Sequence, residues 1–216
     1  MACAFGVKKE NGQLIKMTRL IAFGDSLTFG HWLDPTDTYP SDRAWPKVLG
    51  DMLGYRVVNT AVPGHSNIQI LKDILNFEFQ QTDIVIVGWT YPQRDYIFRK
   101  NLLGTDTSIR VNAWHKDTKF IEKWAAVHNN YDLSVRTGLH IHHAECFLKT
   151  KNVQQHHFSS SWAWYEVVPN FISTPTTYIN EDILTMVDKA LDNSHPGHVS
   201  HSNAAKKLYG IINAPK

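Results

Sequence analysis

The chain has 216 residues, of which 43% are hydrophobic and 12% aromatic, which is enough for one sizeable core. Its 22 lysines and arginines nearly balance its 20 aspartates and glutamates, and no long block of either sign occurs. This balance argues against nucleic acid as a partner. No stretch approaches the roughly 18 apolar residues of a membrane span, so we expect no membrane partner either.

The first residues, MACAFGVKKENGQLIK, contain only a short and weakly apolar run and lack the features of a secretion signal. We therefore predict a polar N-terminal extension over residues 1–17 and a single domain over residues 18–216. Because the sequence shows neither a secretion signal nor a membrane span, we expect the protein to reside in the cytoplasm. A component of a virion would also lack both features. Nothing in the chain indicates its oligomeric state.

Three short apolar runs, each bounded by Gly, Asp or Asn, indicate strands that are buried on both faces: residues 20–23, 57–59 and 84–87. Between them, apolar spacing predicts one helix that ends at Gly54 and another that is capped by Ser66. The second helix is expected to bury Ile68, Leu71, Ile74, Leu75 and Phe79. Because parallel neighbours need such crossovers, the alternation predicts an α/β fold with three layers, α/β/α, around a mostly parallel sheet.

The pattern is weaker in the second half of the chain. We predict an irregular stretch over 102–116, helices over 121–128 and 139–149, a fourth strand within HFSSSWAW (157–164), a helical segment over 180–191 and a closing helix over 204–212. A fourth strand that follows these helices would extend the same sheet.

Polar clusters follow each of the first three predicted strands: GDSLTFG, NTAVPGHSN and GWTYPQR. Because the carboxyl ends of parallel strands meet at one edge, Ser26, Gly64 and Thr90 should lie near one another. A nucleophilic serine needs a base within hydrogen-bond reach and a third group that orients this base. Asp192 stands three residues before His195, just ahead of the last helix. Such a pair arises by chance about once in a chain of this size, so its weight comes from its position.

Taken in order, these motifs resemble the SGNH or GDSL hydrolase family. The matching segments, which span about residues 18–212, are Gly-Asp-Ser-Leu, Asn59-x-Ala61-x-x-Gly64, the Gly88 turn and Asp192-x-x-His195-Pro196. The resemblance implies the flavodoxin-like SGNH hydrolase fold and a serine esterase without a cofactor or a metal. In that family's roles Ser26 attacks the ester, His195 is the base, and Asp192 orients the histidine.

The resemblance also implies an oxyanion hole made of the Ser26 and Gly64 N–H groups and an asparagine amide. Thr90 stands where the family has this asparagine, so the third donor is altered. A threonine hydroxyl reaches less far than an amide, and losing one such donor costs roughly 3–4 kcal/mol, about 10²–10³ in rate. The alternative donors are Asn67, Gln93 and Arg94.

Three functions stay open from the sequence. A serine esterase is the first, and the polar loops that carry tryptophans favour a short acyl group on a carbohydrate as its substrate. These tryptophans are Trp32, Trp89, Trp114, Trp162 and Trp164. The second is a binding or structural protein that kept the fold and lost efficient catalysis; the altered third block resembles viral and phage-encoded members of the family. The third is acyl transfer to an acceptor other than water.

Overall fold

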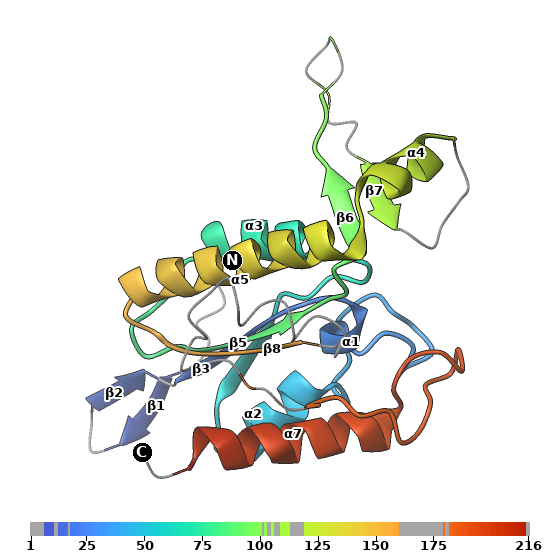
Figure 1. Cartoon of the computed structure of the whole chain (residues 1–216). Coiled ribbons are helices and arrows are strands. Elements are labelled where there is room, and N and C mark those ends of the chain that lie inside the picture. Colours follow the sequence, from blue (N-terminus) through green and yellow to red (C-terminus); the bar gives the residue numbers. More distant parts are fainter. Residues whose placement is uncertain are drawn as a thin grey trace.

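A parallel sheet of four strands, in the order β4-β3-β5-β8, forms the centre of the molecule (Figure 1). The strands are β3 (Arg19–Phe23), β4 (Arg56–Asn59), β5 (Ile84–Trp89) and β8 (Gln154–Ser159). The computed structural model describes residues 7–10, 13–16, 18–100, 102, 105, 109–112, 119–159, 179 and 182–214. The four predicted strands are confirmed, although the fourth begins already at Gln154, and residues 160–164 lie outside the described residues.

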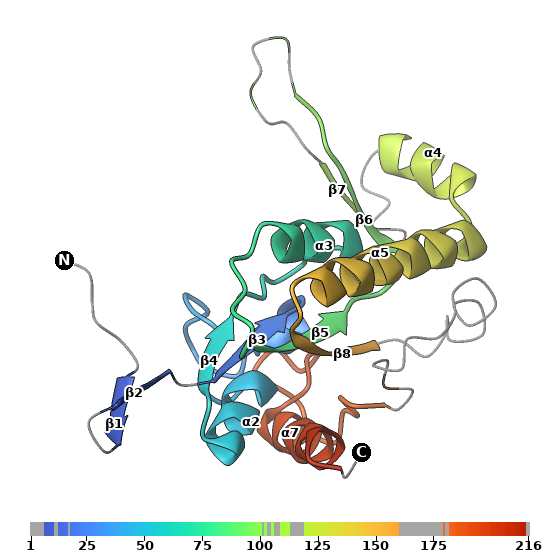
Figure 2. The ribbon, with the colours of Figure 1, turned by 90° about the vertical axis from the view of Figure 1, so that its left-hand side faces the viewer.

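Helices cover both faces of the sheet, as two perpendicular views show (Figure 1, Figure 2). The covering helices are α2 (Trp45–Leu53), α3 (Asn67–Leu75), α5 (Asn130–Thr150) and α7 (His198–Ile212). Within β3, Ile21 and Phe23 pack with α3 and α5, whereas Leu20 and Ala22 pack with α2 and α7. Burial on both faces explains why the strands are continuous apolar runs. The predicted α/β/α architecture is confirmed.

The ends of α2 and α3 follow from local sequence. Helix α2 stops at Gly54, whose φ of 68° is left-handed and therefore favours glycine. Helix α3 begins after Ser66, and the Ser66 N–H donates to Gln69 Oε1 at 3.0 Å, one half of a capping box. The predicted start is confirmed. The helix ends before Phe79, however, so that this ring packs on Phe23 from the following loop.

A hairpin follows β5, and its second strand lies in the stretch that the sequence predicts to be irregular. Strand β6 (Arg94–Ile97) pairs antiparallel with β7 (Ile109–Asn112). Val111 of β7 is buried against Trp124 and Leu133. Two strands of four residues with one buried valine give almost no period-2 signal, which is why the irregular stretch predicted over 102–116 is wrong at β7. Residues 103–104, 106–108 and 113–116 of that prediction lie outside the described residues.

The predicted helical segment before the closing helix is also wrong. Within residues 182–191 the chain forms turns, and Lys189 forms a bridge with Pro196. The Asp188 carboxylate accepts the N–H groups of Val199 and Ser200 at 2.9 and 2.8 Å. These bonds cap α7 and hold the preceding backbone away from helical geometry.

The remaining elements are short. They are β1 (Val7–Glu10), β2 (Gln13–Lys16), α1 (Ser26–Phe29) and α4 (Lys119–Val127). Strands β1 and β2 pair as an antiparallel hairpin within the segment predicted as a polar extension. Helices α4 and α5 confirm the two helices predicted in the middle region, although α5 begins at Asn130, ahead of the predicted start at residue 139. Among the described residues, no helix combines the length and apolar character needed to cross a membrane.

Candidate active site

Ser26 lies at the carboxyl edge of the sheet because β3 passes directly into the short helix α1. Asp25 is the N-cap of α1, and its Oδ1 accepts the Leu27 N–H at 3.0 Å. This bond closes a sharp turn that sets Ser26 at the first position of the helix. The serine is buried except for 6% of its surface.

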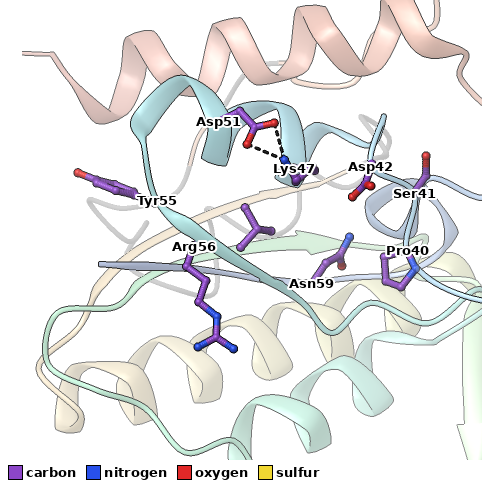
Figure 3. A pocket seen from close by; sticks show the side chains of 9 residues that line it. Pro40, Ser41, Asp42, Lys47, Asp51, Tyr55, Arg56 and Asn59 are labelled. Carbon is purple, nitrogen blue, oxygen red and sulfur yellow. Dashed lines mark hydrogen bonds and ion pairs between the residues drawn. The ribbon is translucent and has the colours of Figure 1, made fainter. Parts of the chain in front are cut away.

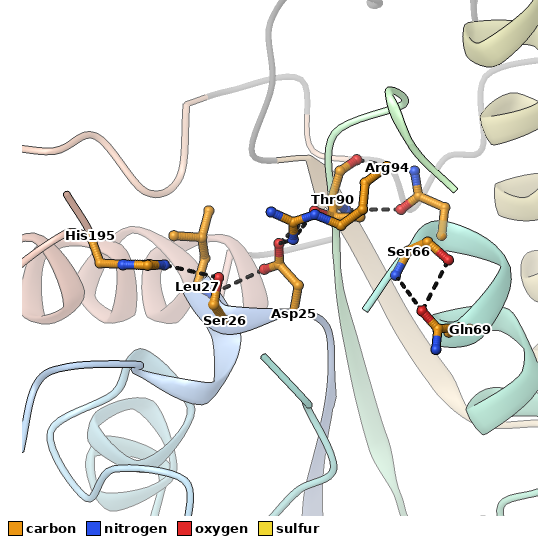
Figure 4. A network of polar contacts seen from close by, with 9 residues as sticks. Asp25, Ser26, Leu27, Ser66, Gln69, Thr90, Arg94 and His195 are labelled. Carbon is orange, nitrogen blue, oxygen red and sulfur yellow. Dashed lines mark hydrogen bonds and ion pairs between the residues drawn. The ribbon is translucent and has the colours of Figure 1, made fainter. Parts of the chain in front are cut away.

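Three side chains that are distant in sequence form a hydrogen-bonded chain at this edge. Ser26 Oγ lies 3.2 Å from His195 Nε2, across 169 residues of sequence (Figure 4). His195 Nδ1 lies 2.6 Å from Asp192 Oδ2. A carboxylate at Nδ1 favours the tautomer that carries its proton there, and Nε2 is then left as an acceptor for the serine hydroxyl. The geometry of a serine, a base and an orienting carboxylate is therefore present.

The Asp192 carboxylate is held in its ionised form. Burial opposes ionisation, but hydrogen bonds from the side chains and backbone N–H groups of Ser194 and His195 outweigh burial and keep the pKa of Asp192 well below its ordinary value. The two backbone groups donate to Oδ1, each at 3.1 Å. Asp192 can therefore stabilise a positive charge on His195 when the imidazole takes up a proton.

The loop that carries the histidine is anchored beside the serine. The Leu191 N–H donates to the Trp32 carbonyl at 3.0 Å, and the Ala190 N–H donates to the His195 carbonyl at 2.9 Å. The His31 ring packs edge-on against His195 with a centroid distance of 5.2 Å. These contacts tie residues 190–195 to the segment after α1, so the base is positioned by backbone bonds as well as by its own side chain.

Thr90 follows β5 and lies in a buried polar network instead of facing an open site. Its hydroxyl donates to Asp25 Oδ2 at 2.5 Å, and Arg94 Nη1 donates to the same carboxylate oxygen at 2.7 Å and to Thr90 Oγ1 at 3.1 Å (Figure 4). Thr90 is fully buried. A hydroxyl has one hydrogen, and here this hydrogen is directed to Asp25. The arrangement thus runs against the expectation that Thr90 donates to an oxyanion.

The alternative side-chain donors are also engaged. Asn67 Nδ2 donates to the Thr90 carbonyl at 3.0 Å and to Thr137 Oγ1 at 3.1 Å, which uses both of its hydrogens. Gln93 Nε2 donates to Asn130 at 3.3 Å. These bonds fix the third block to α3 and α5 and use both hydrogens of the Asn67 amide, whereas the bond to Asn130 uses one of the two Gln93 amide hydrogens. Backbone N–H groups are further candidates for an oxyanion hole.

Two backbone N–H groups suit that role. Gly64 has a φ of 77°, the left-handed conformation that favours glycine, in the loop after β4. The Val62 N–H in the same loop donates to the Gly24 carbonyl at 3.3 Å, so this loop runs beside the turn that holds Ser26. Among the described residues, neither the Ser26 N–H nor the Gly64 N–H has a hydrogen-bond acceptor.

We predict that Arg94→Gln lowers the free energy of unfolding by about 3 kcal/mol or more, because the ion pair with Asp25 is buried and the carboxylate would lose its charge partner. The side chains of Arg94 and Asp25 are 15% and 3% exposed. Urea unfolding followed by circular dichroism measures this change. The Asp25→Asn/Arg94→Gln double variant should recover part of the loss, since no uncompensated charge is left buried.

A matched control for this prediction is Arg43→Gln. Arg43 pairs with Asp34 at 3.6 Å, but these side chains are 60% and 32% exposed. An exposed pair contributes about 1 kcal/mol or less. A loss for Arg94→Gln no larger than that for Arg43→Gln would contradict the prediction.

The tryptophans do not form a shared cleft in the described part of the chain. Trp89 is fully buried, and its Nε1 donates to His157 Nδ1 at 3.1 Å, so it is a core residue. Trp32 is 40% exposed beside His31. Trp114, Trp162 and Trp164 lie outside the described residues. Nor do three or more His, Cys, Asp or Glu side chains gather among the described residues as a candidate metal site.

A pocket of about 470 Å³ lies apart from these groups, along α2 and β4 (Figure 3). Lys47 and Asp51, which line it, form an ion pair across one helical turn at 2.5 Å. None of Ser26, His195 and Asp192 lines this pocket. A second pocket of about 410 Å³ includes Arg94 and Asn67 and is therefore continuous with the third block.

Comparison with known proteins defines the class of fold. No family model and no curated protein matches the sequence. Solved structures do match in three dimensions, and they have the fold of the SGNH or GDSL hydrolases, as expected from the motifs.

Three of these solved structures illustrate the likeness. An acetyl xylan esterase from Butyrivibrio proteoclasticus has a TM-score of 0.58 and 15% identity, over 94% of this chain and 67% of its own. A carbohydrate acetylesterase family member from Sinorhizobium meliloti has a TM-score of 0.54 and 10% identity, over 91% and 97%. A protein assigned to the G-D-S-L family of lipolytic proteins, from Desulfitobacterium hafniense, has a TM-score of 0.53 and 12% identity, over 89% and 98%. At these identities the shared feature is the fold.

Proposed function

We propose that this protein is a serine esterase with residues 18–216 as its catalytic domain. The observation that carries the proposal is the hydrogen-bonded chain from Asp192 through His195 to Ser26, with distances of 2.6 and 3.2 Å. A weak nucleophile beside a base that is itself oriented by a carboxylate is the arrangement that acyl transfer requires. The likeness to solved esterases supports the same reaction class.

The reaction follows from these positions. Ser26 Oγ attacks the acyl carbon while His195 Nε2 takes the hydroxyl proton, and the carbonyl electron pair moves onto its oxygen. The Ser26 and Gly64 N–H groups stabilise that oxyanion, and Asp192 stabilises the imidazolium. The oxyanion collapses, the bond to the alcohol breaks, and His195 returns its proton to the leaving oxygen. Water then attacks the acyl-enzyme by the same steps, which releases the acid and restores Ser26.

For the substrate we propose a short acyl ester on a carbohydrate. This class agrees with the acetyl xylan esterase and the carbohydrate acetylesterase among the solved structures that share the fold. Acyl transfer to an acceptor other than water would use the same triad, and product analysis with a sugar acceptor present separates it from hydrolysis.

A second candidate function is a binding protein that shares the fold without efficient catalysis. The observation that favours it is the engagement of Thr90 with Asp25, which leaves two backbone donors in place of three donors. Loss of one donor reduces the rate by about 10²–10³ without abolishing attack by the serine. A slow enzyme and an inactive protein therefore differ in whether Ser26 still reacts.

Covalent labelling tests the proposed function directly. A fluorophosphonate probe should modify one serine stoichiometrically, and peptide mass spectrometry should identify it as Ser26, because only an activated serine attacks such a probe at neutral pH. The modified protein should also lose turnover of 4-nitrophenyl acetate. Labelling no faster than that of heat-unfolded protein would contradict the esterase and favour the binding protein.

A further inference from the structure

The hairpin β6–β7 presents two arginines on one face. In the antiparallel register Tyr96 stands opposite Arg110, and cross-strand partners share a face, as do residues two apart along a strand. Arg94, Tyr96 and Arg110 therefore lie on one side of the hairpin. The other side carries Val111 and Ile97, which pack towards α4 and α5. The arginine face is thus the one turned away from those helices.

Both arginines reach the candidate active site. Arg94 Nη1 contacts Asp25 at 2.7 Å, immediately before Ser26 in the chain. Arg110 rests on Gly64: a methyl group placed on this glycine would lie 2.3 Å from Arg110 Nη1 and 2.9 Å from Cζ. One face of the hairpin therefore touches the turn of the candidate nucleophile and also the glycine that offers an oxyanion donor.

Arg94 and Arg110 differ in whether an acidic side chain pairs with them. Arg94 is mostly buried and pairs with Asp25. Arg110 is exposed, and within the described part of the chain no acidic side chain forms an ion pair with it. Asp73 pairs instead with His65 at 3.1 Å, and Asp95 lies on the opposite side of the hairpin, across from Val111. Among the described residues, Arg110 is thus a cation without an acidic partner at the edge of the site.

We propose that Arg110 binds a carboxylate of the substrate, so that the protein acts on esters that carry a negative charge close to the scissile bond. This inference rests on the proposed esterase function and names its substrate class. A guanidinium offers a planar pair of N–H donors that matches a carboxylate, and Arg110 lies against Gly64, whose N–H is a candidate oxyanion donor. The carboxylate belongs to the acyl group, as in a dicarboxylic half ester, or to the alcohol, as in an acidic sugar.

Two pairs of substrates distinguish whether the carboxylate belongs to the acyl group or to the alcohol. For the acyl group, mono-4-nitrophenyl glutarate is compared with 4-nitrophenyl valerate. For the alcohol, 4-acetoxybenzoate is compared with its methyl ester. Rates are corrected with the Ser26→Ala protein, which removes spontaneous hydrolysis. We expect the wild-type protein to prefer the charged member of one pair, and that pair identifies where the carboxylate lies.

The test variants are Arg110→Gln and Arg110→Lys, with Arg56→Gln as the matched control. Arg56 is an exposed arginine at the start of β4, the opposite end of that strand from the site. In Arg110→Gln the preference for the charged ester should fall about tenfold or more, mainly through KM, since a hydrogen bond to a charged group is lost. Rates on the neutral esters should stay within about twofold, Arg110→Lys should keep part of the preference, and Arg56→Gln should keep all of it.

Two kinetic outcomes would overturn the proposal. If Arg110→Gln lowers the rates on charged and neutral esters equally, Arg110 stabilises the oxyanion that both kinds of ester form, or it stabilises the fold. If the variant lowers neither rate, Arg110 does not belong to the site. If the wild-type protein hydrolyses none of the four esters, the esterase proposal fails, and calorimetric titration of the Ser26→Ala protein decides the carboxylate site alone. Binding of 4-acetoxybenzoate that exceeds binding of its methyl ester and is lost in Ser26→Ala/Arg110→Gln supports the site; equal or absent binding overturns it.

Discussion

Replacement of Ser26 by alanine is expected to lower kcat for 4-nitrophenyl acetate by roughly 10⁵-fold or more. In the proposed mechanism Ser26 Oγ is the atom that forms the covalent bond with the acyl group, and it lies 3.2 Å from His195 Nε2. The residual rate should still exceed that of water, since the backbone N–H groups of residues 26 and 64 are unaffected. Initial rates at saturating ester measure the loss.

The fold should survive this substitution, which allows the kinetic result to be interpreted. The Ser26 hydroxyl contributes one hydrogen bond, worth about 1 kcal/mol net. Ser202→Ala, a serine on α7 outside the site, is the matched control and should keep wild-type turnover. Equal rates for wild type and Ser26→Ala, at matched urea unfolding midpoints, would refute the role of Ser26 in catalysis.

Much of the fold could be predicted because its central strands are buried on both faces. Runs such as Leu20–Phe23 need apolar residues at every position, and this pattern is easy to distinguish from amphipathic helices. Ser26, His195 and Asp192 could be proposed as one site from the sequence. Ser26 follows a strand, and Asp192 and His195 precede a helix, in the order typical of a known family. The hydrogen-bond distances between these side chains can be read only from the tertiary structure.

The predictions failed where long-range contacts decide local structure. The pattern over residues 182–191 is helical, yet Asp188 is drawn into the cap of α7 and the segment forms turns. Strand β7 is held by one buried valine, Val111, and by pairing with β6. Neither the cap by Asp188 nor the packing of Val111 produces a periodic pattern of apolar residues in the sequence. Arg94 and Arg110 were consequently not recognised together as side chains of one surface.

Long-range contacts also decide the role of Thr90, which the resemblance places at the position of an oxyanion donor. Its hydroxyl joins Arg94 on the Asp25 carboxylate. Thr90 and Arg94 thus act together to hold the turn before Ser26. Since Arg94 belongs to β6, Thr90 and the hairpin are structurally coupled. A hairpin that contacts both the turn before Ser26 and Gly64 with one face is suited to select substrates.

Replacement of Asp192 by asparagine is expected to lower kcat by about 10⁴-fold while the protein remains folded. The asparagine oxygen can still accept the backbone N–H groups of Ser194 and His195, which donate to Oδ1 at 3.1 Å. Its amide, however, presents hydrogens towards His195 Nδ1. The imidazole then carries its proton on Nε2, which points at Ser26 and can no longer accept from it. Stopped-flow measurement of acyl-enzyme formation locates the loss in the chemical step.

The control for this substitution is Asp182→Asn, because Asp182 is a partly exposed carboxylate that accepts from Thr185 Oγ1 at 2.8 Å and has no contact with Ser26 or His195 among the described residues. The pH dependence of stability provides a second readout. The pKa of Asp192 is lowered in the folded protein, so its ionised form stabilises the fold above the ordinary carboxyl pKa of about 4, and this contribution is lost as pH falls towards the lowered value. Asp192→Asn should therefore weaken acid destabilisation below about pH 4. An unchanged kcat in Asp192→Asn would remove this carboxylate from the mechanism.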